Sequence, residues 1–284
     1  MAIFTNQATL SYNNTTTTSN IVTGELLEVL SATKNALNSE YRYGDTVTYV
    51  ISIINTGTFA FNNLTITDNL GEYTLGALTE TPLTYVDGSL TYYINGVLQI
   101  GATAVAGPPL VISGISVPAG GNVLVLYAAR VNEFAPLASG STIVNEATIS
   151  GAGLTSPIVV SDTISITDAA QLSITKSISP NAVAENAQLT YTFTIQNTGN
   201  TAAIATDNVA VTDLFDPILE NITVSLNGTV LAEGTQYTYD ETTGLFLTVT
   251  GVITVPAATY TQDITTGQWN ILPGVTVLTV TGTV

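Results

Sequence analysis

The feature that most constrains the fold is an internal repeat whose last part is found at the opposite end of the chain. The segment 30–34 (Leu-Ser-Ala-Thr-Lys) matches 172–176 (Leu-Ser-Ile-Thr-Lys), and 49–57, which ends in Asn-Thr-Gly, matches 191–199 with the same spacing. Two further matches complete the shared region: 64–68 with 209–213, and 117–120 with 272–274. Such self-similarity predicts two copies of one structural unit, each large enough for its own core.

The first copy continues beyond the region that the two copies share. It contains 142–150 (Thr-Ile-Val-Asn-Glu-Ala-Thr-Ile-Ser), then a turn, then 158–166. The second copy stops at Val284 without these segments, but 3–11 (Ile-Phe-Thr-Asn-Gln-Ala-Thr-Leu-Ser) matches the first of them and 21–25 matches the second. The sequence therefore predicts that the N-terminus carries the closing hairpin that the C-terminal copy lacks.

The residue types predict an all-β chain. Thr and the β-branched aliphatics favour strands, short clusters of Gly, Pro and Asn favour turns, and no sustained helical periodicity occurs. We expect two tandem immunoglobulin-like β-sandwiches preceded by a hairpin. The expected parts are a donor hairpin at 1–25, a complete domain at 26–168, and a domain at 169–284 that lacks its closing strands.

A sandwich that lacks its last strands exposes an apolar groove and unpaired strand edges. A hairpin from a neighbouring subunit fills such a groove by β-strand addition. Because this contact is head-to-tail, it propagates into a filament unless it closes into a ring. Return of the hairpin to its own C-terminal domain is unfavourable, since the first domain lies between them. A remaining alternative is a fragment of a longer repeat array, cut out of phase.

The residue inventory excludes several functions. Four basic against 21 acidic residues give a formal charge of −17, which argues against nucleic acid and anionic membranes as partners. Cys and His are absent, so disulfides, Cys/His zinc sites and a Ser-His-Asp triad are impossible. We predict no metal, no cofactor and no enzyme activity on an external substrate. The acidic surface favours solubility, with attraction of divalent cations as the alternative.

Strand parity directs one Lys, one Asp and one Asn inward in each domain, because alternate residues of a strand face opposite sides. The residues are Lys34, Asp68 and Asn145 in the first domain, and Lys176, Asp213 and the hairpin's Asn6 in the second. The two lysines are the only ones in the chain. An unpaired buried ammonium is costly, so each Lys needs a partner or must lose its charge.

Each trio has the groups needed for an isopeptide bond. A neutral Lys amine attacks the Asn side-chain carbonyl, a protonated Asp acts as proton shuttle, and ammonia leaves. Burial favours this state, because it lowers the pKa of Lys and raises that of Asp. We predict one bond within the chain, Lys34 to Asn145, and one between chains, Lys176 to Asn6. Two alternatives satisfy the same groups: a non-covalent network, or lysines that reach the surface and protect strand edges from aggregation.

The segments 172–177, 191–199 and 211–213 resemble the conserved repeat of bacterial and archaeal surface proteins known as domain of unknown function number eleven. The closing motif of that repeat is matched at 144–149 and at 5–10. The resemblance implies an immunoglobulin-like sandwich on an envelope, stalk or fibre. The Lys/Asn/acid trio is similar to that of the self-crosslinking domains of Gram-positive pili and adhesins, but the chain shows no sortase sorting signal, which favours self-assembly.

Together these observations predict the structural subunit of an extracellular filament on a cell or spore surface. Its partners would be identical subunits and an anchoring protein that the sequence does not identify. No segment of the sequence is typical of a membrane span or of a signal peptide, and a protein laid onto a spore from inside the mother cell needs no signal peptide. The competing interpretation is a monomeric adhesin or stalk module of a longer surface protein.

Overall fold

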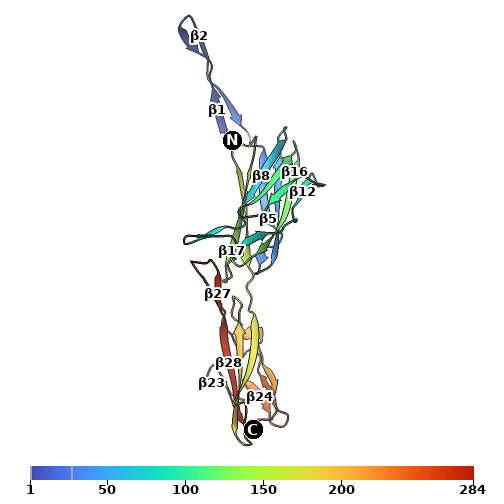
Figure 1. Ribbon diagram of the computed structural model, residues 1–284, viewed down its shortest axis with the longest axis vertical. Helices are drawn as coiled ribbons and strands as arrows, with labels where there is room; N and C mark the ends of the chain where they lie inside the picture. Colours follow the sequence, from blue (N-terminus) through green and yellow to red (C-terminus); the bar gives the residue numbers. More distant parts are fainter. Residues whose placement is uncertain (1, 27) are drawn as a thin grey trace.

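A computed structural model describes residues 2–26 and 28–284, almost entirely as β-strands and turns. The chain is an extended rod, with the N-terminal hairpin projecting at one end and the C-terminus at the other (Figure 1). Two separate hydrophobic cores lie along the rod, one within residues 30–166 and one within residues 170–284. The prediction of an all-β, immunoglobulin-like fold is confirmed.

The N-terminal hairpin consists of two short paired pieces. Strand β1 (Ala2–Asn6) pairs with β4 (Val22–Leu26), and β2 (Thr9–Tyr12) pairs with β3 (Thr15–Thr18). Between the two pieces the pairing shifts by one residue, since Asn6 lies opposite Val22 whereas Thr9 lies opposite Thr18. Met1, the first residue of the predicted donor segment, lies outside the described residues.

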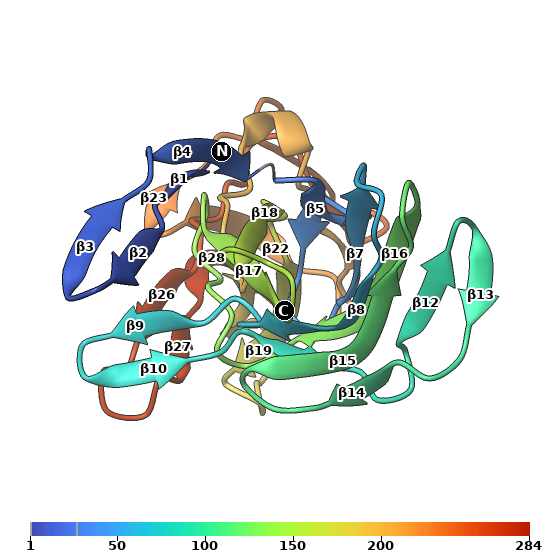
Figure 2. The same cartoon turned by 90° about the horizontal axis from the view of Figure 1, so that it is seen from above.

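The first domain is a sandwich of two six-stranded sheets. One sheet has the order β13 (Val97–Gln99), β12 (Thr91–Ile94), β16 (Asn122–Val131), β7 (Thr46–Asn55) and β5 (Leu30–Ala36), with β11 (Leu83–Tyr85) also paired to β16. The other has the order β14 (Thr103–Val105), β15 (Leu110–Val117), β8 (Phe61–Asp68), β17 (Thr142–Ser150), β18 (Ile158–Ile166) and β6 (Glu40–Tyr41). The β12–β13 hairpin projects on one side of the rod, and the hairpin of β9 (Tyr73–Leu75) and β10 (Leu78–Glu80) on the other (Figure 2).

The second domain has one large sheet and two smaller ones. The large sheet has the order β19 (Leu172–Ser179), β20 (Gln188–Asn197), β28 (Gly274–Thr283), β22 (Glu220–Leu226) and β23 (Thr229–Val230). The smaller sheets are β21 (Thr212–Leu214), β25 (Leu245–Thr248) and β24 (Tyr237–Asp240), and the pair β26 (Thr259–Gln262) and β27 (Trp269–Leu272). A short 3-10 turn, η1 (Ala205–Asp207), precedes β21.

The repeated Asn-Thr-Gly sequence forms the same buried turn in both domains. The carboxamides of Asn55 and Asn197 each accept a bond from the backbone N–H two residues on, at Gly57 and Gly199, and donate to backbone carbonyls of neighbouring loops. A side chain at position 199 would lie 2.1 Å from the carbonyl oxygen of Ala169, so glycine is required there. These asparagines therefore hold turns together.

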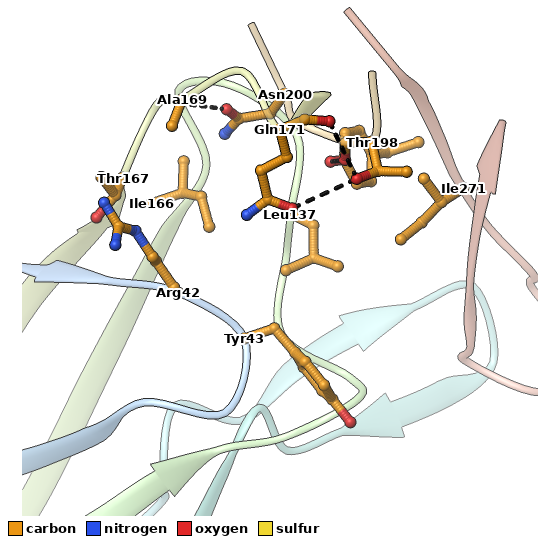
Figure 3. Close-up of a pocket in the computed structure, with 12 residues that line it drawn as sticks. Arg42, Tyr43, Leu137, Ile166, Thr167, Ala169, Gln171, Thr198, Asn200 and Ile271 are labelled. Carbon is orange, nitrogen blue, oxygen red and sulfur yellow. Dashed lines mark hydrogen bonds between the residues drawn. The ribbon is translucent and has the colours of Figure 1, made fainter. Parts of the chain in front are cut away.

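Contacts between the two domains surround the connection from β18 to β19. The Asp168 carboxylate in this connection accepts bonds from Ser139 of the first domain and Asn200 of the second, both at 2.9 Å. On another side, Gln262 of β26 donates to the Tyr73 hydroxyl at 2.5 Å. Both domains also line a small pocket at this junction, with Arg42, Tyr43 and Leu137 facing Gln171, Thr198 and Ile271 (Figure 3). These contacts join the two domains at this junction.

Over residues 2–26 and 28–284, the chain forms no helix with the length and apolar character needed to cross a membrane.

Candidate functional site

The first domain buries three polar side chains between its two sheets. Lys34 lies on β5 in one sheet, whereas Asp68 on β8 and Asn145 on β17 lie in the other. Lys34 is 3% exposed, and Asp68 and Asn145 are fully buried. The alternation of each strand explains this placement, because each residue shares the inward face with apolar neighbours such as Ile66 and Ala147. The structure therefore brings these three sequence-predicted residues into one core.

A fourth residue, which the sequence analysis did not include, connects the three. The Lys34 ammonium donates to Asp68 Oδ2 at 2.6 Å. The hydroxyl of Tyr127, on β16, donates to the same carboxylate oxygen, and the Asn145 carboxamide donates to the Tyr127 hydroxyl at 3.2 Å. The order of contacts is thus Lys, Asp, Tyr and Asn. The signal for Tyr127 was present in the sequence, because it shares parity with the inward-facing Val123 and Val125.

The electrostatics of this site favour a reactive amine. Burial lowers the pKa of Lys34 to about 8, and the nearby Asp68 charge only partly opposes this effect. The ammonium also lies 4.9 Å from the centre of the Tyr49 ring, which stacks on Tyr127. Asn145 Oδ1 is buried without a hydrogen-bond partner among the described residues. A buried carbonyl oxygen without a hydrogen-bond partner costs free energy of folding, so Asn145 Oδ1 destabilises this arrangement.

The second domain contains the corresponding half of the site in a more open form. Lys176 of β19 and Asp213 of β21 form an ion pair, in which the side chains are 39% and 19% exposed. The Lys176 ammonium lies 4.3 Å from the centre of the Tyr191 ring and 5.3 Å from that of Phe215. Lys176 thus faces the aromatic part of the core, as strand parity predicts, but water still reaches it.

The strand that carries each lysine has buried inward-facing side chains in the first domain and exposed ones in the second. Leu30 of β5 is 9% exposed, whereas its counterpart Leu172 of β19 is 41% exposed. The other inward positions of β19 are open too, with Ile174 at 53% and Ile178 at 43%. These exposed aliphatic side chains form an uncovered apolar face, which is called the groove below, and burying each one would contribute about 1.5–3 kcal/mol.

The groove occupies the place that β17 and β18 take in the first domain. There, β17 pairs with the edge of β8 so that Ala147 lies opposite Asp68, and β18 closes the gap to β5 through a bond from the Ala36 N–H to the Asp162 carboxylate at 2.6 Å. In the second domain, β21 pairs with β25 on one edge. Its other edge, which would face Ala147's counterpart, pairs with no strand of the described chain.

Asn6, the remaining predicted site residue, is on β1 in the exposed hairpin. The hairpin projects from the end of the rod opposite the C-terminus (Figure 1). Within one chain the structure therefore does not bring Asn6 to Lys176 and Asp213. Among residues 2–26 and 28–284, no three acidic side chains gather as metal ligands would.

The described geometry defines a rod of two immunoglobulin-like sandwiches, with a buried Lys–Asp–Tyr–Asn chain in the first and an open Lys–Asp half-site in the second. No family model matches the chain, so the resemblance to the conserved repeat of surface proteins stays a prediction. No curated protein matches it either.

Solved structures with partial structural similarity include two pilins. The major pilin subunit of Bacillus cereus aligns over 95% of this chain and 73% of its own, with 12% identity and a TM-score of 0.36. A C-terminal fragment of the major pilin of Streptococcus agalactiae aligns over 79% of each chain, with 12% identity and a TM-score of 0.36. The collagen-binding domain of a Staphylococcus aureus adhesin aligns over 47% of this chain and 96% of its own, with 11% identity and a TM-score of 0.31. At this level of overlap the function must be argued from the geometry of the chain itself.

Proposed function

We propose that the chain is the structural subunit of an extracellular filament, in which the N-terminal hairpin of one subunit completes the C-terminal domain of the next. The observation that carries the proposal is the contrast between the matched strands β5 and β19. The same sequence pattern is buried in the domain that has β17 and β18, and exposed in the domain without them. The hairpin carries the sequence of the missing strands.

The hairpin has an apolar surface of its own that needs a partner. Six of its large apolar side chains are more than half exposed: Ile3, Phe4, Leu10, Tyr12, Ile21 and Val22. An isolated two-stranded hairpin is at best marginally stable in water. Insertion into the groove would cover apolar residues on both surfaces, and the new main-chain hydrogen bonds would add affinity.

The first domain supplies the expected register of insertion. There, Thr148 pairs with Thr67 and Ala147 with Asp68. Because 3–11 matches 142–150 and 209–213 matches 64–68, Thr9 of the hairpin should lie opposite Thr212 of the next subunit. In this register Asn6 enters the core as Asn145 does in the first domain.

The shape of the rod supports a head-to-tail polymer. The hairpin projects beyond the first domain, and the second domain forms the other end (Figure 1). A donor at one end and an acceptor near the other make a heterologous contact, which repeats without limit unless it closes into a ring. Identical subunits are therefore the partners that we propose, together with an anchoring protein of unknown identity at a cell or spore surface.

The proposal includes covalent locks in both domains. Lys34 would bond to Asn145 within the first domain, with Asp68 as proton shuttle. When the hairpin inserts, Asn6 would reach the Lys176–Asp213 pair and form the equivalent bond between subunits. The inserted hairpin would shield Lys176 from water, as the first domain already shields Lys34. An isopeptide bond at every joint would make the filament a continuous covalent chain.

Removal of the hairpin tests assembly. We expect the full chain to form filaments visible by electron microscopy, and a variant that lacks residues 2–25 to remain monomeric while both domains stay folded by circular dichroism. A matched control replaces the outward-facing Thr5 by Ser and should polymerise normally. Filaments from the shortened variant would refute the donor role, and a monomeric full-length chain would favour the adhesin or stalk interpretation.

Boiling in SDS tests the covalent joint separately. A ladder of multiples is expected from the full chain, and the Asn6→Ala variant should give filaments that boil down to monomers. A single monomer band from native filaments would leave hairpin exchange intact but would exclude the bond between Lys176 and Asn6.

A further inference from the structure

The buried Tyr127 hydroxyl links two other groups of the first-domain site, the Asp68 carboxylate and the Asn145 carboxamide. It donates to Asp68 Oδ2 and accepts a bond from the Asn145 carboxamide nitrogen at 3.2 Å. It is the only described contact between the carboxylate and the amide that would leave as ammonia. Asp68 itself is held by Lys34 on one side and by the Leu70 N–H on the other.

We propose that Tyr127 is a catalytic residue of the first-domain crosslink and that its hydroxyl delivers the proton to the leaving nitrogen of Asn145. This inference rests on the proposed Lys34–Asn145 bond and assigns to it a residue outside the Lys, Asp and Asn trio. The position of the hydroxyl, between the proton carrier and the leaving group, is the one that a general acid needs.

The proton and bond changes balance within the four residues. Lys34 first passes one proton to Asp68, and its neutral Nζ then bonds to the Asn145 Cγ, whose carbonyl becomes an oxyanion. As the oxyanion re-forms the carbonyl and the bond from Cγ to Nδ2 breaks, Tyr127 gives its proton to Nδ2 and takes the proton of Asp68. Nζ then returns a proton to Asp68. The products are a Lys–Asn amide, free ammonia, a neutral Tyr127 and a protonated Asp68.

The surroundings of Tyr127 suit this role. The side chain is fully buried, and burial together with the neighbouring Asp68 charge raises its pKa well above the usual value for tyrosine. The hydroxyl therefore stays protonated under conditions where the chain folds. Its ring stacks on Tyr49 at 5.6 Å between centroids, which fixes its direction and would keep a phenylalanine in the same place.

The second domain has no equivalent hydroxyl. Tyr127 pairs with Tyr49, and Val280 pairs with Tyr191, the counterpart of Tyr49, so Val280 occupies the matching position. The hydroxyl is thus specific to the first domain, and its removal should affect one crosslink and not the other.

The test measures crosslinking during synthesis of the full-length chain. In an Asn6→Ala background, which isolates the first domain, samples from cell-free synthesis are quenched in acidic denaturant, and their intact mass reports the loss of ammonia, about 17 Da. The Tyr127→Phe variant should lose it on the order of a hundredfold more slowly, as for loss of a general acid. The control is Tyr92→Phe, which removes another buried hydroxyl, bonded to the Ser116 backbone.

The possible outcomes distinguish the proton role of Tyr127 from the existence of the crosslink. Slow loss in Tyr127→Phe, with normal loss in Tyr92→Phe and comparable thermal stability of the uncrosslinked forms, supports the proton role. Equal rates in all three chains would overturn it while leaving the crosslink itself in place. Absence of mass loss in the Asn6→Ala parent would overturn both the crosslink and the role of Tyr127, without touching the hairpin exchange.

Discussion

The two domains are built from the same repeated strands, yet only the first has a closed site. Lys34 and Lys176 each pair with an Asp on a matched strand, but the first lysine is almost fully buried and the second is partly open to water. The difference lies in β17 and β18: β18 lies beside β5 in the first domain, whereas no strand of the described chain takes the matching place beside β19. Burial of the lysine therefore goes with the closing strands, and in the proposed assembly the second domain would bury its lysine when a hairpin inserts.

The same comparison relates two proposed events, insertion of the hairpin and formation of the crosslink. In the open half-site Lys176 is 39% exposed to water, and the hairpin that carries Asn6 lies at the opposite end of the rod. Insertion of the hairpin would bring the Asn and the dry surroundings together in one step, because the same strands supply both. A crosslink that depends on insertion forms only after the hairpin has entered the groove. We therefore expect the amount of crosslink to measure correct assembly.

The largest effect is expected from a charge placed in the groove. Ile174→Glu should abolish filament formation, because a carboxylate would have to be buried under the incoming hairpin. The monomer should unfold with a free energy within about 0.5 kcal/mol of the parent, since the side chain is 53% exposed. Electron microscopy and urea unfolding of the monomer measure the two effects.

The matched change in the first domain should behave in the opposite way. Ala32, the counterpart of Ile174, packs against the core under β18. We expect Ala32→Glu to destabilise the first domain by about 2–5 kcal/mol, because it forces a charge into a closed interface. If both substitutions had the same effect on folding, the contrast between covered and uncovered strands would be wrong.

A second, smaller effect is expected from loss of the internal bond. Asn145→Ala should lower the unfolding free energy of the first domain by about 4 kcal/mol, by analogy with a covalent link that closes a loop of about 100 residues. Calorimetry should show a fall in melting temperature on the order of 15 °C. Asn6→Ala is the control, since it removes only the bond between subunits. A change below about 1 kcal/mol would indicate that Asn145 contributes hydrogen bonds and packing alone.

The sequence was sufficient to predict the all-β fold and the inward direction of Lys34, Asp68 and Asn145, because strand alternation and apolar neighbours determine which side faces the core. The repeat also located the hairpin at the N-terminus. These features depend on strand alternation and on repeated segments, both of which a single sequence contains.

Other features depend on contacts between distant strands. The contacts of Tyr127 with Asp68 and Asn145 depend on β16 facing β8 and β17 from the other sheet, which parity alone does not specify. The extent to which Lys176 is exposed likewise depends on which strands pack beside β19. The division of the hairpin into two short pieces with a one-residue shift is not visible in the sequence either.

The smallest expected effect is a pH dependence that appears when Lys34 is left free. In Asn145→Ala, Lys34 should titrate near its lowered pKa of about 8 in the folded state, against 10.5 in the unfolded state. Between these values the unfolded state binds more protons, so stability rises with pH. We expect a gain of about 1 kcal/mol from pH 7 to pH 9 in urea unfolding.

The control for this titration is the double variant Lys34→Met, Asn145→Ala, which should lack the gain. The parent chain should lack it too, because an amide does not titrate. A parent that shows the same rise would carry a free Lys34 amine and would contradict the internal crosslink.

The most direct test of hairpin exchange uses the absence of cysteine from the chain. Two variants, Thr9→Cys and Thr212→Cys, are co-expressed in the Asn6→Ala background, so that any covalent dimer must be a disulfide between chains. The account predicts a reducible dimer after mild oxidation, and none when Thr5→Cys, four residues out of register, replaces Thr9→Cys. Equal yields from the two pairs, or no dimer from Thr9→Cys in assembled filaments, would contradict insertion of the hairpin beside β21.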